Sequence, residues 1–133
     1  MLILMMIACS QKHIPQKLTA RIGNDFAHTI AHSSDYDLYR WDQELRQEKE
    51  MNAVQQAKIQ QFLLRSKNYV FGANVRCRLR PDHALVIRKG ETTYKILLSK
   101  RDRCPKLRFV SPDNKTVISL RPKALKRLQA QLP

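Results

Sequence analysis

The chain has 133 residues, enough for one domain that buries about two thirds of its unfolded surface without a stabilising metal. It carries 25 Lys and Arg against 11 Asp and Glu, and residues 69–133 hold 16 of these basic and only 4 of these acidic side chains. That asymmetry favours an acidic partner, while a total of three glycines argues against a glycine-rich loop that cradles phosphates.

The first eight residues, 1–8, are uncharged and apolar. They are too few to span a bilayer, which takes roughly 20 residues, and are typical of the apolar region of a signal peptide. Met6-Ile7-Ala8-Cys9 resembles the lipobox of bacterial lipoproteins. The resemblance implies cleavage before Cys9 and lipidation of Cys9. The run after Cys9 is polar and without periodicity, which predicts a tether over residues 9–17. A buried N-terminal strand or helix is the alternative interpretation.

Apolar side chains then recur every four residues, which predicts an amphipathic helix; they are Leu18, Ile22, Phe26 and Ile30. Asp25, His28 and His32 lie on the flank of this stripe at a spacing that places three metal-competent side chains on one helix face. No fourth ligand is nearby in the sequence. We therefore expect no metal and no cofactor.

Ser33-Ser34-Asp35 is typical of a helix start, with Asp37 placed as in a capping box. No Gly or Pro occurs before about Arg65, so the pattern predicts one long helix. Its aromatic N-terminal end is predicted to pack in the core, and its polar middle to lie in solvent.

The second half predicts an antiparallel sheet of about five strands, because short alternating or apolar runs are separated by turn residues. The predicted strands are Val75–Arg80, Ala84–Arg88, Thr92–Leu98, Leu107–Val110 and Thr116–Leu120. Pro122 suits the first turn of a short helix over residues 123–131. The fold class is therefore α+β, with one domain over residues 18–133. It divides into a helical part at 18–66, the sheet at 69–120 and a C-terminal helix at 122–131.

If Cys9 is lipidated, Cys77 and Cys104 remain as a pair. We expect them to form a disulfide in an oxidising compartment, closing a loop of about 28 residues and stabilising the fold by roughly 3–4 kcal/mol. Two free thiols in a cytosolic protein are the alternative. The pattern from Cys77 through Pro81 and His83 to Cys104 resembles a group of small bacterial exported proteins, and this resemblance implies no activity.

Basic side chains concentrate on the predicted sheet. Arg76, Arg78 and Arg80 alternate with apolar residues, so we expect their guanidinium groups about 7 Å apart on one strand face. The predicted anion-binding set comprises Arg76, Arg78, Arg80, Arg88, Lys95 and Arg108, which can bind phosphates or carboxylates.

The sequence therefore predicts a non-enzymatic lipoprotein of the bacterial cell envelope. It would be anchored in the membrane, face the periplasm and bind an acidic envelope component or protein. A cytosolic basic protein that binds nucleic acid is the alternative. An enzymatic reading requires Cys77 and His83 as a nucleophile pair oriented by Asp82, which conflicts with the disulfide.

Overall fold

The computed structural model describes residues 13–41, 45–72, 76–101 and 103–132, with side chains omitted at 41 and 45–49. Seven antiparallel strands form one sheet in the order β2-β1-β4-β5-β6-β7-β3. The strands are β1 (Tyr36–Trp41), β2 (Leu45–Glu50), β3 (Tyr69–Val70), β4 (His83–Lys89), β5 (Thr92–Leu98), β6 (Lys106–Val110) and β7 (Lys115–Leu120). The helices are α2 (Gln16–Ile22), α3 (Asn24–His32), α4 (Ala53–Leu63), the 3-10 turn η1 (Ser66–Asn68) and α5 (Pro122–Gln131).

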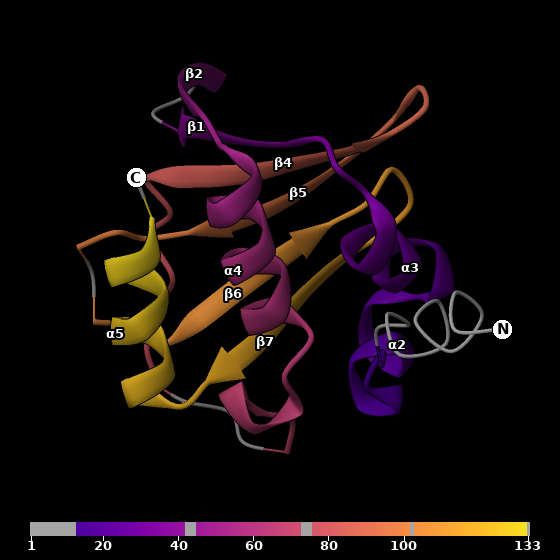
Figure 1. Cartoon of the computed structure of the whole chain (residues 1–133). Helices are drawn as coiled ribbons and strands as arrows, with labels where there is room; N and C mark the ends of the chain where they lie inside the picture. Colours follow the sequence, from indigo (N-terminus) through magenta and orange to yellow (C-terminus); the bar gives the residue numbers. More distant parts are fainter. Residues whose placement is uncertain (1–12, 42–44, 73–75, 102, 133) are drawn as a thin grey trace, which may run out of the picture.

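The helices gather on one face of the sheet, with α4 and α5 lying across its strands (Figure 1). The main core lies between these two layers, because alternate residues of each strand meet the apolar stripes of the helices. Phe26 of α3 packs against Tyr94 and Phe109, with ring centroids 4.7 and 5.6 Å apart respectively. The predicted α+β class is thus confirmed, as is the β4-β5-β6-β7 meander that short turns implied.

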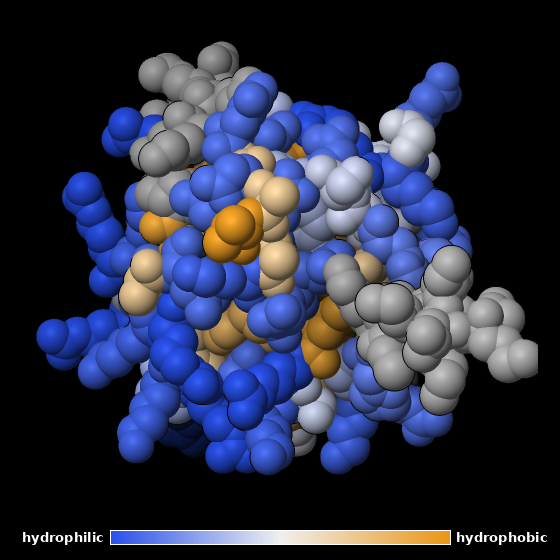
Figure 2. Space-filling view, in the orientation of Figure 1, coloured by the Kyte–Doolittle hydropathy of each residue, from blue (hydrophilic) through white to orange (hydrophobic). Residues whose placement is uncertain are grey.

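The outer surface over the helices is mostly hydrophilic, with small scattered apolar areas (Figure 2). Among the described residues, the exposed large hydrophobic side chains are Val54 and Val117. This surface therefore offers no broad apolar area of the kind that marks a docking face.

The predicted N-terminal helix is two helices. Leu18, Ile22, Phe26 and Ile30 are all buried, so the stripe was correctly identified. Gly23 separates α2 from α3 because its φ of 93° lies in a region that other residues rarely adopt.

The prediction of one long helix from about residue 35 to residue 65 is wrong over its first half. Residues 36–41 and 45–50 form the antiparallel pair β1–β2, and β1 also pairs with β4 along five residue pairs. Tyr36 and Leu38 are fully buried on the core face, which is the alternation of a strand. The helix begins later, where Asn52 and Gln55 form a reciprocal capping box.

The prediction of a strand at Val75–Arg80 is also wrong. Val75 lies outside the described residues, and residues 76–82 belong to no strand. Their side chains still alternate, since Arg76, Arg78 and Arg80 are exposed while Leu79 is buried. An extended segment can alternate in this way without a partner strand.

Two tyrosine hydroxyls donate hydrogen bonds to the C-terminal ends of the helices that precede them. The Tyr36 hydroxyl donates to the carbonyl of Ile30 in α3, and the Tyr69 hydroxyl donates to the carbonyl of Leu63 in α4. Each tyrosine is the first residue of the next strand, six residues further on. The last carbonyls of a helix lack intrahelical partners, so each phenol satisfies one of them inside the core.

Candidate anion-binding surface

The three clustered arginines lie on a segment that is held by a cross-link instead of by strand pairing. Cys77 and Cys104 form the predicted disulfide, with their Cα atoms 5.7 Å apart. Lys106 Nζ also donates to the carbonyl oxygen of Cys77 at 2.7 Å. Together with buried Leu79, these contacts fix the backbone that carries the arginine side chains.

We call Arg76, Arg78 and Arg80 the arginine segment. All three side chains are exposed, and none makes a hydrogen bond or ion pair to the part of the chain that the structure describes. Their charges are therefore not offset by the described residues. A guanidinium left in this state can form bidentate contacts with a carboxylate or a phosphate.

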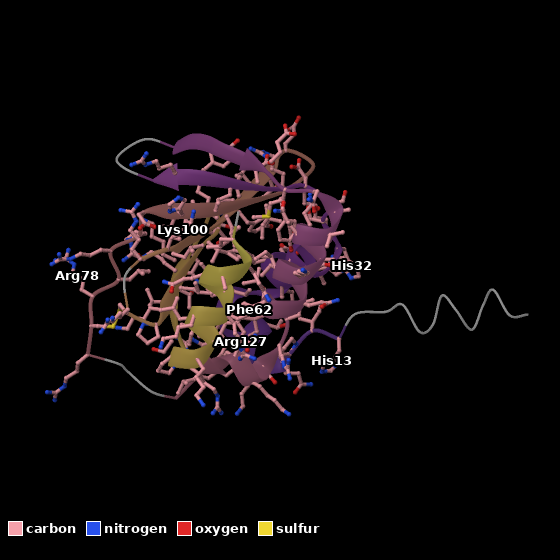
Figure 3. The ribbon with its side chains drawn as sticks, turned by 60° about the vertical axis from the view of Figure 1, so that its left-hand side comes forward. His13, His32, Phe62, Arg78, Lys100 and Arg127 are labelled. Carbon is pink, nitrogen blue, oxygen red and sulfur yellow. A yellow bond between two sulfur atoms is a disulfide. The ribbon has the colours of Figure 1, made fainter. Side chains whose placement is uncertain are left out.

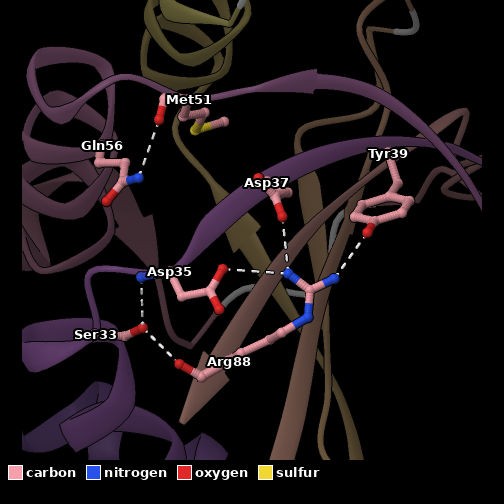
Figure 4. Close-up of polar contacts among 7 residues, drawn as sticks. All are labelled: Ser33, Asp35, Asp37, Tyr39, Met51, Gln56 and Arg88. Carbon is pink, nitrogen blue, oxygen red and sulfur yellow. Dashed lines mark hydrogen bonds and ion pairs between the residues drawn. The ribbon is translucent and has the colours of Figure 1, made fainter.

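Arg88 is placed differently, on β4 beside β1 (Figure 4). Its guanidinium donates to Asp37 at 2.8 Å, to Asp35 at 3.2 Å and to the Tyr39 hydroxyl at 2.7 Å. The hydrogen bond to Asp37 raises the pKa of Arg88, against the effect of its burial. The side chain also lies 5.7 Å from the centre of the Tyr39 ring. Arg88 thus already has acidic partners within the chain.

Lys95 and Arg108 lie on the sheet face opposite the main core. Lys95 pairs with Val110 and Arg108 pairs with Leu97 across β5 and β6, so the two cations are diagonal neighbours. A hollow of about 400 Å³ on this face is lined by Arg88 and Lys95, among others. Lys106 is on the same face of β6, and its contact with Cys77 joins this face to the arginine segment.

The six predicted residues therefore form parts of a surface and not one site. Lys95, Arg108 and Arg88 are on the open face of the sheet, and the arginine segment adjoins one end of it. Cys9 lies outside the described residues.

A polar cluster that the sequence did not predict joins the start of β4 to the end of β5. Asp82 Oδ1 is 2.7 Å from His83 Nδ1 and accepts from the Lys100 backbone amide at 2.9 Å. Ser99 Oγ donates to the other oxygen of Asp82 at 3.4 Å. Burial raises the pKa of Asp82. The hydrogen bonds and the adjacent His83 lower this pKa by more, so that it lies below its usual value.

The Asp82 carboxylate of this cluster contacts both His83 and Ser99, one through each oxygen. The Cys77 sulfur is in the disulfide and is not a thiolate. The only sequence indication of the cluster is the turn before β4, since the partners at 99 and 100 are distant in the chain.

The histidines of α3 contact each other. The His28 and His32 rings lie 4.3 Å apart. Within the described ranges, no three His, Cys, Asp or Glu side chains are grouped so that they could hold a metal ion. No helix there is both long enough and apolar enough to cross a membrane.

Comparisons of this chain with protein-family models, with curated proteins and with solved structures find no match. The fold and the arrangement of the charged residues are therefore the basis for assigning a function.

Proposed function

We propose that this protein is a non-enzymatic lipoprotein of the bacterial cell envelope that binds an acidic partner through its basic surface. One observation carries the proposal: the arginine segment is exposed, is unpaired with the described part of the chain, and is fixed by a disulfide.

The disulfide supports an exported location, because disulfides persist in oxidising compartments and are rare in the cytosol. It uses two of the three cysteines, which leaves Cys9 in its lipobox-like context. Acylation of Cys9 would tether the chain to a membrane with the domain on the periplasmic side.

The charge distribution supports an acidic partner. The chain pairs Arg88 with two carboxylates but supplies none to the arginine segment from its described residues. Three guanidinium groups close together on one short segment can engage several carboxylates or phosphates at once. Affinity for such a polyanion should fall steeply with salt, because binding releases counterions.

The anchor is tested with Cys9→Ser in the native host. We expect the parent protein to fractionate with membranes and to carry an acyl mass on Cys9, and the variant to lose both. A parent chain without acylation contradicts the lipoprotein assignment.

The binding surface is tested with the variant Arg76→Gln, Arg78→Gln and Arg80→Gln. The control is Lys58→Gln, Lys89→Gln and Lys115→Gln, which removes the same charge from exposed positions elsewhere. Salt titrations against polyglutamate and against a 20-base-pair DNA duplex supply the readout. We expect the arginine variant alone to lose at least tenfold affinity for polyglutamate and to show a flatter salt slope. Equal losses by both variants contradict a localised surface. Sequence-selective DNA binding by the parent supports the nucleic-acid alternative instead.

A further inference from the structure

A second basic region lies where the chain enters the domain. A hollow of about 750 Å³ is lined by residues from the start of α2, from η1 and β3, and from the residue before α5. We call it the entry cleft. Its cationic lining comprises the exposed side chains of Lys17, Lys67 and Arg121, with His13 beside them.

The cations of the entry cleft are not neutralised by the residues that the structure describes. No acidic side chain is among the described residues that line it. The side chains of Lys17, Lys67 and Arg121 make no hydrogen bond or ion pair to the described part of the chain. The apolar part of the lining includes Tyr69 and Phe71, whose ring centroids are 5.3 Å apart. The cleft thus combines positive charge with an apolar wall.

Chain length connects this cleft to the proposed anchor. Cys9 precedes His13 by four residues, and a fully extended chain spans at most about 3.6 Å per residue. The backbone of His13 is therefore no more than about 14 Å from that of Cys9. An acyl chain on Cys9 would be buried in the bilayer, so a residue lining the cleft must lie close to the headgroup layer.

We propose that the entry cleft faces the membrane and binds the phosphates of anionic phospholipid headgroups. This inference rests on the proposed anchoring at Cys9. Clustered lysines and arginines are attracted to an anionic leaflet within about a Debye length of its surface. The cleft meets that requirement by position as well as by charge, because the tether holds it at the bilayer surface.

The same orientation gives the arginine segment a different role. Arg78 lies on the opposite side of the molecule from His13 (Figure 3). When the entry cleft rests on the membrane, Arg78 lies on the side of the molecule away from it. The two basic regions therefore have different partners: lipid headgroups bind the cleft, and an acidic component away from the membrane surface binds the arginine segment.

The test measures binding to vesicles by full-length chains that all carry Cys9→Ser, so that no acyl group contributes. The cleft variant is Lys17→Gln, Lys67→Gln and Arg121→Gln, and its matched control is Lys58→Gln, Lys89→Gln and Lys115→Gln. Vesicles of phosphatidylcholine with one quarter phosphatidylglycerol are compared with pure phosphatidylcholine. Residues 1–8 are common to all chains, so their contribution cancels in the comparison.

We expect the cleft variant to lose on the order of a hundredfold in partitioning onto phosphatidylglycerol vesicles and the control to lose less than tenfold. On pure phosphatidylcholine the three chains should bind alike. Equal losses by the cleft and control variants overturn the proposal, as does a larger loss by the Arg76, Arg78 and Arg80 variant. If the cleft variant unfolds, the double variant Lys17→Gln, Lys67→Gln tests the same vesicle binding without changing Arg121, the N-cap residue of α5.

This experiment is independent of acylation. If the cleft variant loses vesicle binding but the native chain is not acylated, the headgroup site is supported and the anchor is contradicted. If the native chain is acylated but the cleft and control variants bind vesicles equally, the anchor is supported and the headgroup site is contradicted.

Discussion

Arg88 and the residues of the arginine segment are all cationic, but their backbones are held in place in different ways. Arg88 projects from β4, whose backbone is paired with β1 on one side and β5 on the other. Its guanidinium is bound by two carboxylates and a phenol. The backbone position is therefore set by the sheet, and the charge is offset by the chain itself.

The arginine segment has neither form of support. Its residues belong to no strand, and its backbone is fixed by the Cys77–Cys104 disulfide, the Lys106 contact and buried Leu79. Its charges have no partner in the described part of the chain. The difference separates an arginine that stabilises the fold from three that are available to another molecule.

Removing the cross-link should have the largest effect and should act mainly on the arginine segment. Cys77→Ala or Cys104→Ala is expected to lower the free energy of unfolding by roughly 2–5 kcal/mol in urea titrations, with the double variant little worse than either. Trypsin should then cleave after Arg76 and Arg78 well before it cleaves after Arg88, which the sheet protects. The Arg80–Pro81 bond resists trypsin because proline follows the arginine. If both thiols are alkylated in the native, unreduced protein, there is no disulfide and the proposed difference between the arginine segment and Arg88 is contradicted.

A smaller effect is expected at Arg88. Arg88→Gln leaves Asp35 and Asp37 without their cation, so the free energy of unfolding should fall by about 1 kcal/mol. Arg108→Gln is the matched control, since Arg108 is on the same sheet face without an ion pair to the described residues. Its effect should be within about 0.5 kcal/mol. Equal losses by the two variants would show that the carboxylates do not stabilise the fold through Arg88.

The smallest effect is expected for the arginine segment itself. Replacing Arg76, Arg78 and Arg80 by Gln should change the free energy of unfolding by less than about 1 kcal/mol, because these side chains are exposed and unpaired within the described chain. Thermal and urea unfolding should agree on this. A larger loss would mean that the segment stabilises the fold and that its loss of binding cannot be assigned to charge alone.

The sequence predicted the second half of the fold because its patterns are short-range. The Gly90 hairpin and the turn at Pro112 separate strands whose alternation is visible locally, and they pair as the turns imply. The disulfide followed from counting cysteines. These features need no knowledge of distant residues.

The β1–β2 hairpin was missed because its local composition favours a helix. The run at 42–50 is rich in charged residues spaced four apart, which suits a solvent-exposed helix face. Pairing with β4, almost fifty residues later in the chain, decides the outcome instead. The same error concealed the partners of Arg88, since Asp35 and Asp37 were expected at the start of a helix and not beside a strand.

The arginine segment was partly predicted. Alternation correctly indicated which side chains are exposed, yet alternation alone does not supply a partner strand. Whether a segment joins a sheet depends on which edge remains free, and the outer edge of β7 pairs with β3 instead. That pairing has no local signature in the sequence.

The two tyrosines whose hydroxyls donate to the last carbonyls of α3 and α4 limit the stability of the fold in alkaline solution. Burial raises the pKa of Tyr36 and of Tyr69, so both phenols stay protonated in the folded chain at a pH where they ionise in the unfolded chain. Their contribution to stability is therefore complete below about pH 10 and declines as the pH rises above it. Ionisation of either phenol also removes the proton donated to a helix carbonyl. In strong alkali the two helix ends and the two strands that follow them should come apart together, and phenolate absorbance from these rings should appear only with that unfolding.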